Sequence, residues 1–493
     1  MKKSIIKLLY CTLPLWGLCG CSDFLNEEPQ SDFTQAGTKS EESKSEYLSI
    51  ADAQAQLQGA YNSFKNDIFQ LENYMVNDVQ SDNCYVGGDG VQEMAEDLLN
   101  LTAMNYKVEV VWSQYLSMAG SATNVIENVK LMKVQGEDES ERNRIIAEAK
   151  FIRAWAFFDM VRLWGDLPMV LQLIPTITSE NLDKWYPVMY PTRTPEADVY
   201  KQIISDLDET NTIAYLVSKN KGAFQATKGA AYGLLAKVYA TIGKKKDRDY
   251  TKVVELCNKA IGEGYELVDD FDSLWNPDNK FTSESIFEVL YSTDSPNWAF
   301  WTLLKEEDGT VTWRRYCTPT HDLLNKFDKE KDVRYSSSII WKQAPYDAYY
   351  PSDNYPFSYK IREKNSDIIL MRLADIMLLK AEALVELNEV GPAIDIVNRI
   401  RERAGLGAES LKRNMSQEDA RLAVENERQL ELYMEAQRWY DLLRNERTLD
   451  VMKKHKNEKG EAIFSNLPSF RTKWPVPQSE MDKNANLVQN DGY

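Results

Sequence analysis

Apolar residues recur at helical spacing through most of this 493-residue chain. The pattern is clear at 51–64 and 108–132, where apolar side chains fall on one stripe of a helix. At 142–164 small alanines alternate with bulky aromatic residues, an arrangement that suits closely packed helices. Gly165 and Pro168 follow that stretch and are typical of a helix end. The pattern predicts an all-α body that begins near residue 50.

Two stretches, 226–264 and 374–405, resemble tetratricopeptide-type helix pairs. In the second stretch Ala381 and Ala393 are twelve positions apart, the spacing at which the two helices of such a repeat touch through small side chains. Helix pairs of this kind stack into a solenoid, because one pair alone cannot bury its apolar face. We expect about three or four pairs in this chain.

Residues 271–359 break the helical pattern. They hold 19 of the chain's 54 aromatic residues in 89 positions, together with short clusters of Pro, Gly, Asn and Asp. This composition predicts a loop-rich insertion between helical parts at 50–270 and 360–493. Five of its aromatic residues are expected to anchor the insertion to the helices: Phe271, Trp275, Phe287, Tyr291 and Phe327. Eight others have polar neighbours, and at least two of these are expected to face a ligand: Trp298, Trp301, Trp313, Tyr316, Trp341, Tyr346, Tyr349 and Tyr350.

The charge balance and the missing motifs exclude several classes of function. The chain has 58 Lys and Arg against 76 Asp and Glu, a formal net charge of −18, which argues against a nucleic-acid partner. It has only two histidines, so a multi-histidine metal site is impossible, and it contains none of the common phosphate-loop, dinucleotide, zinc-protease, serine-hydrolase or dithiol motifs. We therefore expect no catalytic residue, no metal and no cofactor. One alternative stays open, because acid spacing cannot exclude a carboxylate pair for glycoside cleavage.

The first twenty residues are typical of an export signal. Three lysines surround the start of an apolar run, Ile5–Leu18, that is shorter than the about 20 residues needed to span a bilayer. The signal ends in Leu18-Cys19-Gly20-Cys21, which resembles a lipobox, and this predicts a lipid on Cys21. An ordinary secretory signal with an incidental cysteine is the alternative. Residues 21–49 are rich in Ser, Glu, Gln, Asn and Thr, so we expect them to form a polar tether between the lipid and a body at 50–493.

Ten short motifs, in order along nearly the whole chain, resemble the SusD/RagB family of outer-membrane nutrient-binding lipoproteins of Bacteroidetes. They are Cys21-Ser-Asp-Phe-Leu, Gly59-Ala-Tyr61-Asn, Glu148-Ala-Lys-Phe-Ile-Arg153-Ala with Trp164-Gly165-Asp166-Leu-Pro168, Asp332-Val-Arg334, Leu370-Met-Arg372-Leu-Ala-Asp375, Ala381-Glu382-Ala383, Asn398-Arg-Ile-Arg401-Glu-Arg403-Ala-Gly405, Glu427-Arg428-Gln-Leu-Glu431-Leu, Arg438-Trp439-Tyr-Asp441-Leu, and Trp474-Pro475-Val-Pro477 with Asn486-Leu-Val-Gln489-Asn490-Asp-Gly492-Tyr493.

The resemblance implies a SusD-like, all-α fold with tetratricopeptide helix pairs. It also implies that the solenoid face docks on a TonB-dependent transporter of the SusC type in the outer membrane, and that loops outside the solenoid bind a glycan or a peptide. We interpret the charged residues of the motifs as scaffold, forming buried or half-buried ion pairs between stacked helices: Arg372, Asp375, Glu382, Arg401, Glu427, Arg428 and Glu431.

The aromatic insertion favours a cell-surface protein that captures oligosaccharides. Sugar rings present apolar faces that stack on Trp and Tyr, while their hydroxyls need polar side chains nearby. A peptide-binding protein of the same fold, a glycoside hydrolase and a structural lid for the transporter are the alternatives. Residues of the early loop at 77–90 are included, because members of the family often use an early loop beside the insertion. The predicted ligand-binding residues are Asp82, Tyr85, Trp298, Trp301, Trp313, Tyr316 and Trp341.

Overall fold

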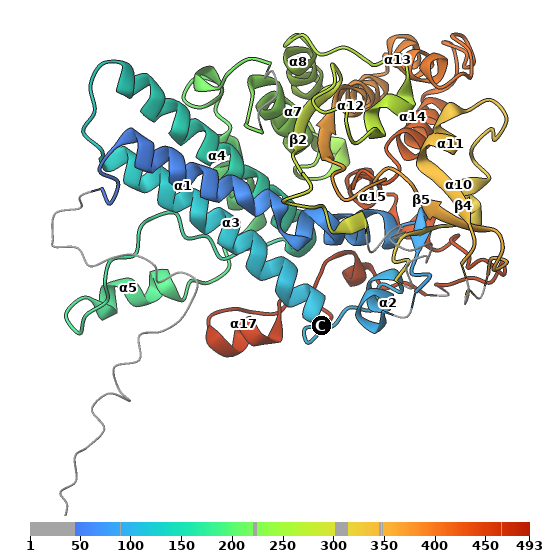
Figure 1. The fold of residues 1–493 in the computed structure, drawn as a ribbon. Helices are drawn as coiled ribbons and strands as arrows, with labels where there is room; N and C mark the ends of the chain where they lie inside the picture. Colours follow the sequence, from blue (N-terminus) through green and yellow to red (C-terminus); the bar gives the residue numbers. More distant parts are fainter. Residues whose placement is uncertain are drawn as a thin grey trace, which may run out of the picture.

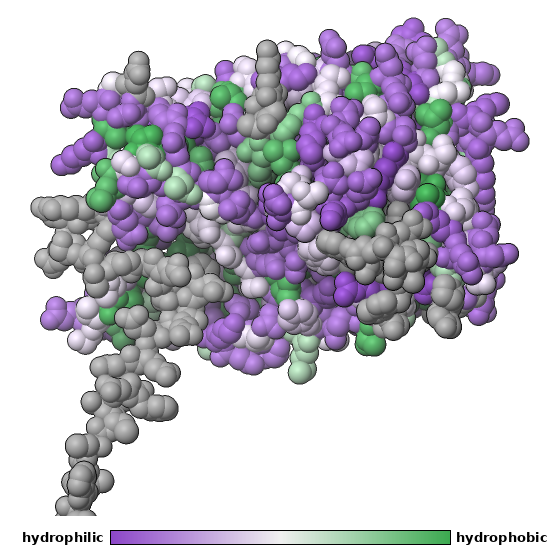
Figure 2. Space-filling view, viewed as in Figure 1, coloured by the Kyte–Doolittle hydropathy of each residue, from purple (hydrophilic) through white to green (hydrophobic). Residues whose placement is uncertain are grey.

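The computed structural model of this chain describes residues 45–88, 90–219, 224–300, 314–344, 347, 349–464 and 466–493. Within them the protein is mainly helical, as the sequence predicts, and hydrophilic residues cover most of the visible face (Figures 1 and 2). Among the helices of these residues, none combines the length and the hydrophobicity that a transmembrane span requires. The expected signal peptide at 1–20, Cys21 and most of the expected tether at 21–49 lie outside the described residues.

Three long helices form the N-terminal part: α1 (Ile50–Asn62), α3 (Tyr106–Leu131) and α4 (Glu137–Trp164). They pack against one another (Figure 1). α1 begins at a capping box, in which the Ser49 side chain accepts the Asp52 backbone N–H and the Asp52 carboxylate accepts the Ser49 N–H. α4 ends at Gly165, whose φ of +74° favours glycine. The three helices predicted from the apolar pattern are therefore confirmed.

Two helix pairs and two further helices follow: α7 (Lys228–Tyr239) with α8 (Tyr250–Ile261), α12 (Leu373–Glu386) with α13 (Val390–Arg403), then α14 (Gln417–Glu431) and α15 (Arg438–Arg444). α8 also packs on α12, and α12 on α14, so the two pairs are neighbours in space although the insertion separates them in the sequence. Ala381 and Ala393 are fully buried on α12 and α13, which contact each other. The predicted pairs at 226–264 and 374–405 are confirmed.

Shorter helical elements connect these parts. One expectation needs correction here: the residues from 77 to 79 lie in a π-helical turn rather than a loop, because Asn77, Asp78 and Val79 belong to the buried element η4. The short elements are η2 (Ser63–Lys65), η3 (Ile68–Glu72), η4 (Met75–Val79), α2 (Val91–Asp97), α5 (Leu182–Met189), α6 (Glu196–Asp206), η5 (Ile213–Tyr215), η6 (Lys245–Asp247), η7 (Phe271–Trp275), α10 (His321–Leu324), α11 (Val333–Ser338), α16 (Thr448–Met452), η8 (Ser469–Thr472) and α17 (Gln478–Lys483).

Short strands form antiparallel pairs. Two pairs tie the insertion to the rest of the chain: β1 (Cys84–Tyr85) with β3 (Thr318–Pro319), and β2 (Ser285–Val289) with β6 (Ile368–Arg372). A further pair, β4 (Ile339–Lys342) with β5 (Tyr355–Ser358), lies within the insertion. β6 leads directly into α12, so the β2–β6 pair fixes the insertion to the start of a helix pair. The five aromatic residues expected to anchor the insertion, Phe271, Trp275, Phe287, Tyr291 and Phe327, are all buried, as predicted.

A buried ion network lies where the insertion meets the C-terminal helices. Its members are Glu284, Asp332, Arg334, Arg372, Arg403, Glu427, Glu431 and Glu435. The Arg372 guanidinium is completely buried and contacts Glu284 at 2.7 Å, Glu431 at 2.6 Å and Glu435 at 2.6 Å. Burial alone would raise the pKa of Glu431, but the guanidinium groups of Arg403, Arg372 and Arg334 hold it well below its usual range.

The charged motif residues are scaffold, as the sequence analysis expects. Asp375 on α12 contacts Arg428 on α14 at 2.9 Å, and Glu382 on α12 contacts Arg444 on α15 at 2.7 Å. Each of these ion pairs joins two different helices. Because both partners are buried and hydrogen-bonded, the pairs fix the angle and register at which the helices stack.

We expect Arg372→Met to lower the free energy of unfolding by about 3–5 kcal/mol, because it removes the one cation that Glu284, Glu431 and Glu435 share and leaves excess negative charge buried. Urea unfolding followed by circular dichroism measures the change. Arg413→Met is the matched control, since Arg413 and Asp395 form an ion pair whose side chains are 66% and 52% exposed. That control should change stability by no more than about 0.5 kcal/mol. Equal effects of the two substitutions would contradict a supporting role for the buried network.

Candidate functional site

The early loop and the insertion meet in the β1–β3 pair. Cys84 pairs with Pro319 and Tyr85 with Thr318, and the Gly87 N–H donates to the Arg315 carbonyl oxygen at 3.0 Å. Gly87 has no room for a side chain, because a Cβ there would lie 2.1 Å from the Tyr355 hydroxyl oxygen. Residues 84–87 of the early loop therefore lie beside the insertion, as expected.

Asp347 organises the aromatic residues around this junction. Its carboxylate accepts a hydrogen bond from the Tyr85 hydroxyl at 3.2 Å. It also accepts the backbone N–H groups of Tyr349 at 2.7 Å and Tyr350 at 2.9 Å, as Asp often does in a turn. One carboxylate thus fixes a residue of the early loop and two residues of the insertion in the same place.

The rings beside Asp347 form one aromatic cluster, made of Tyr85, His321, Trp341, Tyr349, Tyr350 and Tyr355. Tyr350 lies at its centre: its ring centroid is 6.5 Å from that of Tyr85 in a stacked arrangement, 6.0 Å from that of Trp341 and 4.4 Å from that of His321. Tyr349 meets Tyr85 edge-on at 5.3 Å. Offset-stacked and edge-to-face contacts of this kind stabilise a fixed arrangement of rings.

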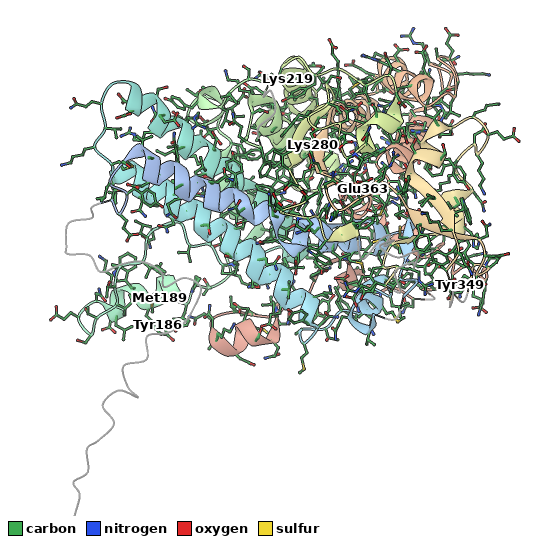
Figure 3. The ribbon with its side chains drawn as sticks, in the orientation of Figure 1. Tyr186, Met189, Lys219, Lys280, Tyr349 and Glu363 are labelled. Atoms are coloured by element: carbon green, nitrogen blue, oxygen red, sulfur yellow. The ribbon has the colours of Figure 1, made fainter. Side chains whose placement is uncertain are left out.

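The cluster has a buried base and a solvent-facing edge. Burial raises the pKa of Tyr85, Tyr350 and Tyr355 far above the usual value, so their hydroxyls stay protonated and can donate hydrogen bonds. Trp341 and Tyr349 are only half-buried. Tyr349 lies near the edge of the molecule in Figure 3. The rings at the edge can therefore accept a flat apolar group from solution.

Polar groups border this edge. The His321 side chain is 44% exposed and forms an ion-pair contact with the Glu458 carboxylate. Burial raises the pKa of Glu458 to about 7 and lowers the pKa of His321, so both shifts favour the uncharged form of the group. The Lys459 ammonium lies 5.6 Å from the centre of the Tyr349 ring. A ligand on the rings would have hydrogen-bond donors and acceptors within reach.

Three of the predicted ligand-binding residues, Tyr85, Tyr316 and Trp341, lie in or beside this region. Tyr85 and Trp341 belong to the cluster, and both contact Tyr350. Tyr316 is buried next to Gly90 of the early loop, since a Cβ on Gly90 would lie 2.9 Å from its ring. The structure therefore brings together residues that are more than 250 positions apart in the sequence.

Asp82 and Trp298 lie elsewhere. Asp82 is buried beneath the surface, where its carboxylate accepts two hydrogen bonds from Arg438 at 2.7 and 2.9 Å and one from Gln429 at 3.1 Å. Trp298 contacts η3, with its backbone N–H donating to Gln70 at 2.7 Å and its indole N–H to Asp67 at 3.1 Å. Trp301 and Trp313 lie outside the described residues, so their roles stay predictions.

The sequence does not predict several residues of the aromatic cluster and its surroundings. Asp347, His321 and Tyr355 were not predicted, whereas Tyr349 and Tyr350 were only among the wider set of candidate ligand-facing aromatics. One local signal exists for Asp347, which precedes the two adjacent tyrosines in the run Asp347-Ala-Tyr349-Tyr350 and can cap their backbone N–H groups. His321 and Tyr355 have no such signal, because only the fold brings them to Tyr350.

The early loop rests on two buried aspartates. Burial alone would raise the pKa of Asp82, but Arg438 holds it well below its usual range. Asp78 accepts hydrogen bonds from Asn83 at 2.9 Å and from the Met434 N–H at 3.1 Å, yet burial raises its pKa from 3.8 to about 6. Among the described residues no donor meets the second oxygen of Asp78. Asp82 therefore contributes stability as an anion, whereas Asp78 contributes it when protonated.

This difference gives a testable pH dependence. The folded state holds the Asp78 proton up to about pH 6 while the unfolded chain releases it near pH 3.8, so the contribution of Asp78 is complete below pH 3.8 and lost between those values. In the wild type, the free energy of unfolding should decrease by about 3 kcal/mol as the pH rises through this range, and Asp78→Asn should abolish that decrease. Urea titrations at several pH values measure it. Asp198→Asn, at a carboxylate 51% exposed, is the control and should keep the wild-type pH dependence.

A hollow in the described part of the chain lies away from the cluster. It has a volume of about 480 Å³ and lies between α12, α14 and the segment 245–250. Its charged side chains are largely paired with one another: Arg421 contacts Glu386 at 2.9 Å, and Arg447 contacts Glu425 at 3.0 Å. The described residues contain no group of three or more His, Cys, Asp or Glu side chains that could hold a metal ion. The aromatic cluster is therefore the better candidate for a ligand site.

The fold and the site define a class: a helix-pair solenoid that carries an aromatic surface on the loops of an insertion. Comparison with known families agrees. A family model described as "Starch-binding associating with outer membrane" matches residues 23–240, and the "SusD family" model matches residues 350–493. The chain belongs to the SusD family.

Relatives and solved structures support this assignment. The chain is 27% identical to SusD-like protein P2 of Formosa agariphila over the full length of both chains, and 22% identical to the starch-binding protein SusD of Bacteroides thetaiotaomicron over 86% of each. A SusD superfamily protein from Parabacteroides distasonis has a TM-score of 0.75 at 22% identity, covering 91% of this chain and 100% of that one. A laminarin-binding SusD-like protein has a TM-score of 0.72 at 22% identity over 92% and 100%. These structural likenesses confirm the predicted fold class.

Proposed function

We propose that this protein is a cell-surface lipoprotein of the outer membrane that captures oligosaccharides and passes them to a SusC-like TonB-dependent transporter. One observation carries the proposal: the half-buried rings of Trp341 and Tyr349 lie on a fixed base of buried tyrosines, with a carboxylate and a histidine beside them. An apolar, flat surface bordered by polar groups suits a sugar ring.

The physical match is specific. The faces of a pyranose ring carry C–H groups that pack on an aromatic ring, while the ring's edge carries hydroxyls that need donors and acceptors. Ligand binding should cost little side-chain conformational entropy at the base of the cluster, because Asp347 and the ring contacts already hold Tyr85 and Tyr350 in place. In this proposal the insertion at 271–359 carries the ligand site, with Tyr85 added from the early loop.

The relatives support the class of ligand. Three of the proteins or families similar to this chain are described as starch-binding or laminarin-binding, and starch and laminarin are both glucose polymers. Another similar structure is described as a surface glycan-binding protein from Bacteroides fluxus. The description of the matching family model also supports the outer-membrane location.

We further propose that the protein binds without catalysis. Cleavage of a glycosidic bond needs two carboxyl groups that flank it. At the aromatic cluster, Asp347 already accepts three hydrogen bonds from the protein, and Glu458 is engaged with His321. Peptide binding by the same fold remains the second candidate within the family, and the binding experiment below includes it.

We expect Trp341→Ala and Tyr349→Ala each to weaken glycan binding by about tenfold, because a stacked ring contributes about 0.5–1.5 kcal/mol beyond its buried area. Calorimetric titration against maltooligosaccharides, laminarin oligosaccharides and a peptide mixture measures the change, with a reducing-end assay on the same samples. Trp301→Ala and Trp313→Ala test the two predicted positions that lie outside the described residues.

Two controls separate binding from folding. Each variant is melted in parallel, and Tyr215→Ala removes a tyrosine that is 44% exposed on η5 in the helical body. The control should bind like the wild type. If every variant that binds more weakly also melts well below the wild type, these rings are core and the ligand lies elsewhere. Release of reducing ends would contradict a purely binding role, and peptide binding alone would favour the second candidate.

The lipid anchor has its own test. We expect Cys21→Ala to move the protein from the membrane fraction to the soluble fraction, because Cys21 is the residue whose sulfur would carry the lipid. Fractionation with immunodetection measures this, and Cys84→Ala is the control, since Cys84 is buried in the body. Retention of the Cys21→Ala variant in the membrane would show that another feature holds the protein there.

A further inference from the structure

An unusually exposed apolar segment lies between α4 and α6. From Met169 to Asp198 not one residue is buried, although the segment includes α5. Leu182 is 41% exposed and Tyr186 is 51% exposed. Soluble proteins seldom leave so many neighbouring apolar side chains in contact with water without a partner to cover them. We call the tip of this segment, residues 181–190, the α5 arm. Its apolar residues are Leu182, Trp185, Tyr186, Val188, Met189 and Tyr190.

The base of the arm is firmly held. Arg193 donates hydrogen bonds to the carbonyl oxygens of Trp164, Asp166 and Val488, at 2.8, 2.8 and 2.9 Å. The Asn486 side chain donates to the carbonyl oxygen of Tyr190 at 2.7 Å. These hydrogen bonds hold the arm in a defined position, so the exposure of its apolar residues is a consequence of the folded structure.

The chemistry of the arm is that of a membrane interface. Trp and Tyr are enriched where a protein meets the headgroup region, because their rings are apolar and their N–H or O–H groups can stay hydrated. The arm has both, with Lys184 at 5.3 Å from the Trp185 ring and the Tyr186 and Tyr190 rings 4.8 Å apart. Tyr186 and Met189 lie on α5 at the lower left of Figure 3.

The position of the arm suits a contact with the surface that holds the lipid anchor. The described chain begins at Ser45, and this start and α5 lie toward the same end of the molecule (Figure 1). Ser45 is 24 positions after Cys21, and a chain of that length reaches at most about 80 Å. A lipid on Cys21 therefore keeps this end of the protein near the bilayer, which favours a weak second contact.

We propose that the α5 arm is a membrane-contacting element that places Trp185, Tyr186 and Met189 among the headgroups of the bilayer to which Cys21 is anchored. This inference rests on the lipid anchor in the proposed function. Residues 22–44 of the chain are poorly suited to cover the apolar residues of the arm, because Ser, Glu, Gln, Thr and Lys dominate this segment. Since the chain has a net charge of −18, contact depends on apolar burial and suits headgroups without net charge.

Site-specific fluorescence tests the contact. The acylated mature protein is reconstituted in phosphatidylcholine vesicles that contain a lipid with a nitroxide close to the headgroup, and its acylation is checked by mass. An environment-sensitive dye is attached to Met189→Cys. The cysteines at 84, 257 and 317 are buried, which protects them from labelling. Leu422→Cys is the matched control, because Leu422 is 37% exposed on α14, at the opposite end of the molecule (Figure 1).

We expect quenching of the dye at position 189 and none at position 422. Adding Leu182→Ser and Tyr186→Ser to the labelled protein should abolish most of the quenching, and both residues are exposed enough to leave the fold intact. Equal quenching at 189 and 422 would overturn the proposal.

Two other outcomes would assign the arm to a different partner and also overturn the proposal. If the dye at 189 is shielded from water in the lipid-free protein, the chain's own N-terminal segment covers the arm. If it is shielded only when a transporter is present in the vesicles, the arm docks on that protein. Glycan titration of the same vesicles measures ligand binding independently of the dye signal. A failure of the membrane contact and a failure of the proposed ligand binding can therefore be told apart.

Discussion

The buried guanidinium of Arg372 is the contact on which the rest of this structure depends. It lies at the end of β6, directly before α12, and it binds Glu284 before β2 as well as Glu431 at the end of α14. One cation thus joins the insertion, a helix pair and the following helix. Carboxylates buried together would repel one another strongly, so the cations of Arg334, Arg372 and Arg403 are a condition for packing these elements at all.

The candidate ligand site depends on that scaffold for its order. Its rings are carried by loops, by the short helix α10 and by strands of two to four residues, which have little stability of their own. They keep one arrangement because the early loop is held at two points: the Asp82 carboxylate pairs with the buried Arg438 guanidinium, and the Tyr85 hydroxyl donates to the half-buried Asp347 carboxylate. The base of the site is therefore rigid, whereas its edge, with Trp341 and Tyr349, stays open to solvent.

The aromatic cluster and the α5 arm lie in different parts of the protein. The aromatic cluster belongs to the insertion, whereas the α5 arm lies between two N-terminal helices, near the start of the described chain (Figure 1). A protein that is held to a surface at one end and binds its ligand at another keeps the ligand site clear of that surface. This separation fits both proposals and requires no movement within the body.

The sequence by itself determined the helical class, the paired helices and the aromatic insertion, because each follows from local pattern: apolar spacing, small residues at helix contacts, and composition. It also identified Tyr85 and Trp341 as candidate ligand residues. Only the tertiary structure decided that Asp82 is paired with Arg438 beneath the surface, that Asp347 holds three tyrosines, and that His321 lies on Tyr350. The physical reason is that these roles depend on burial and on partners up to 356 positions away, and neither can be read from neighbouring residues.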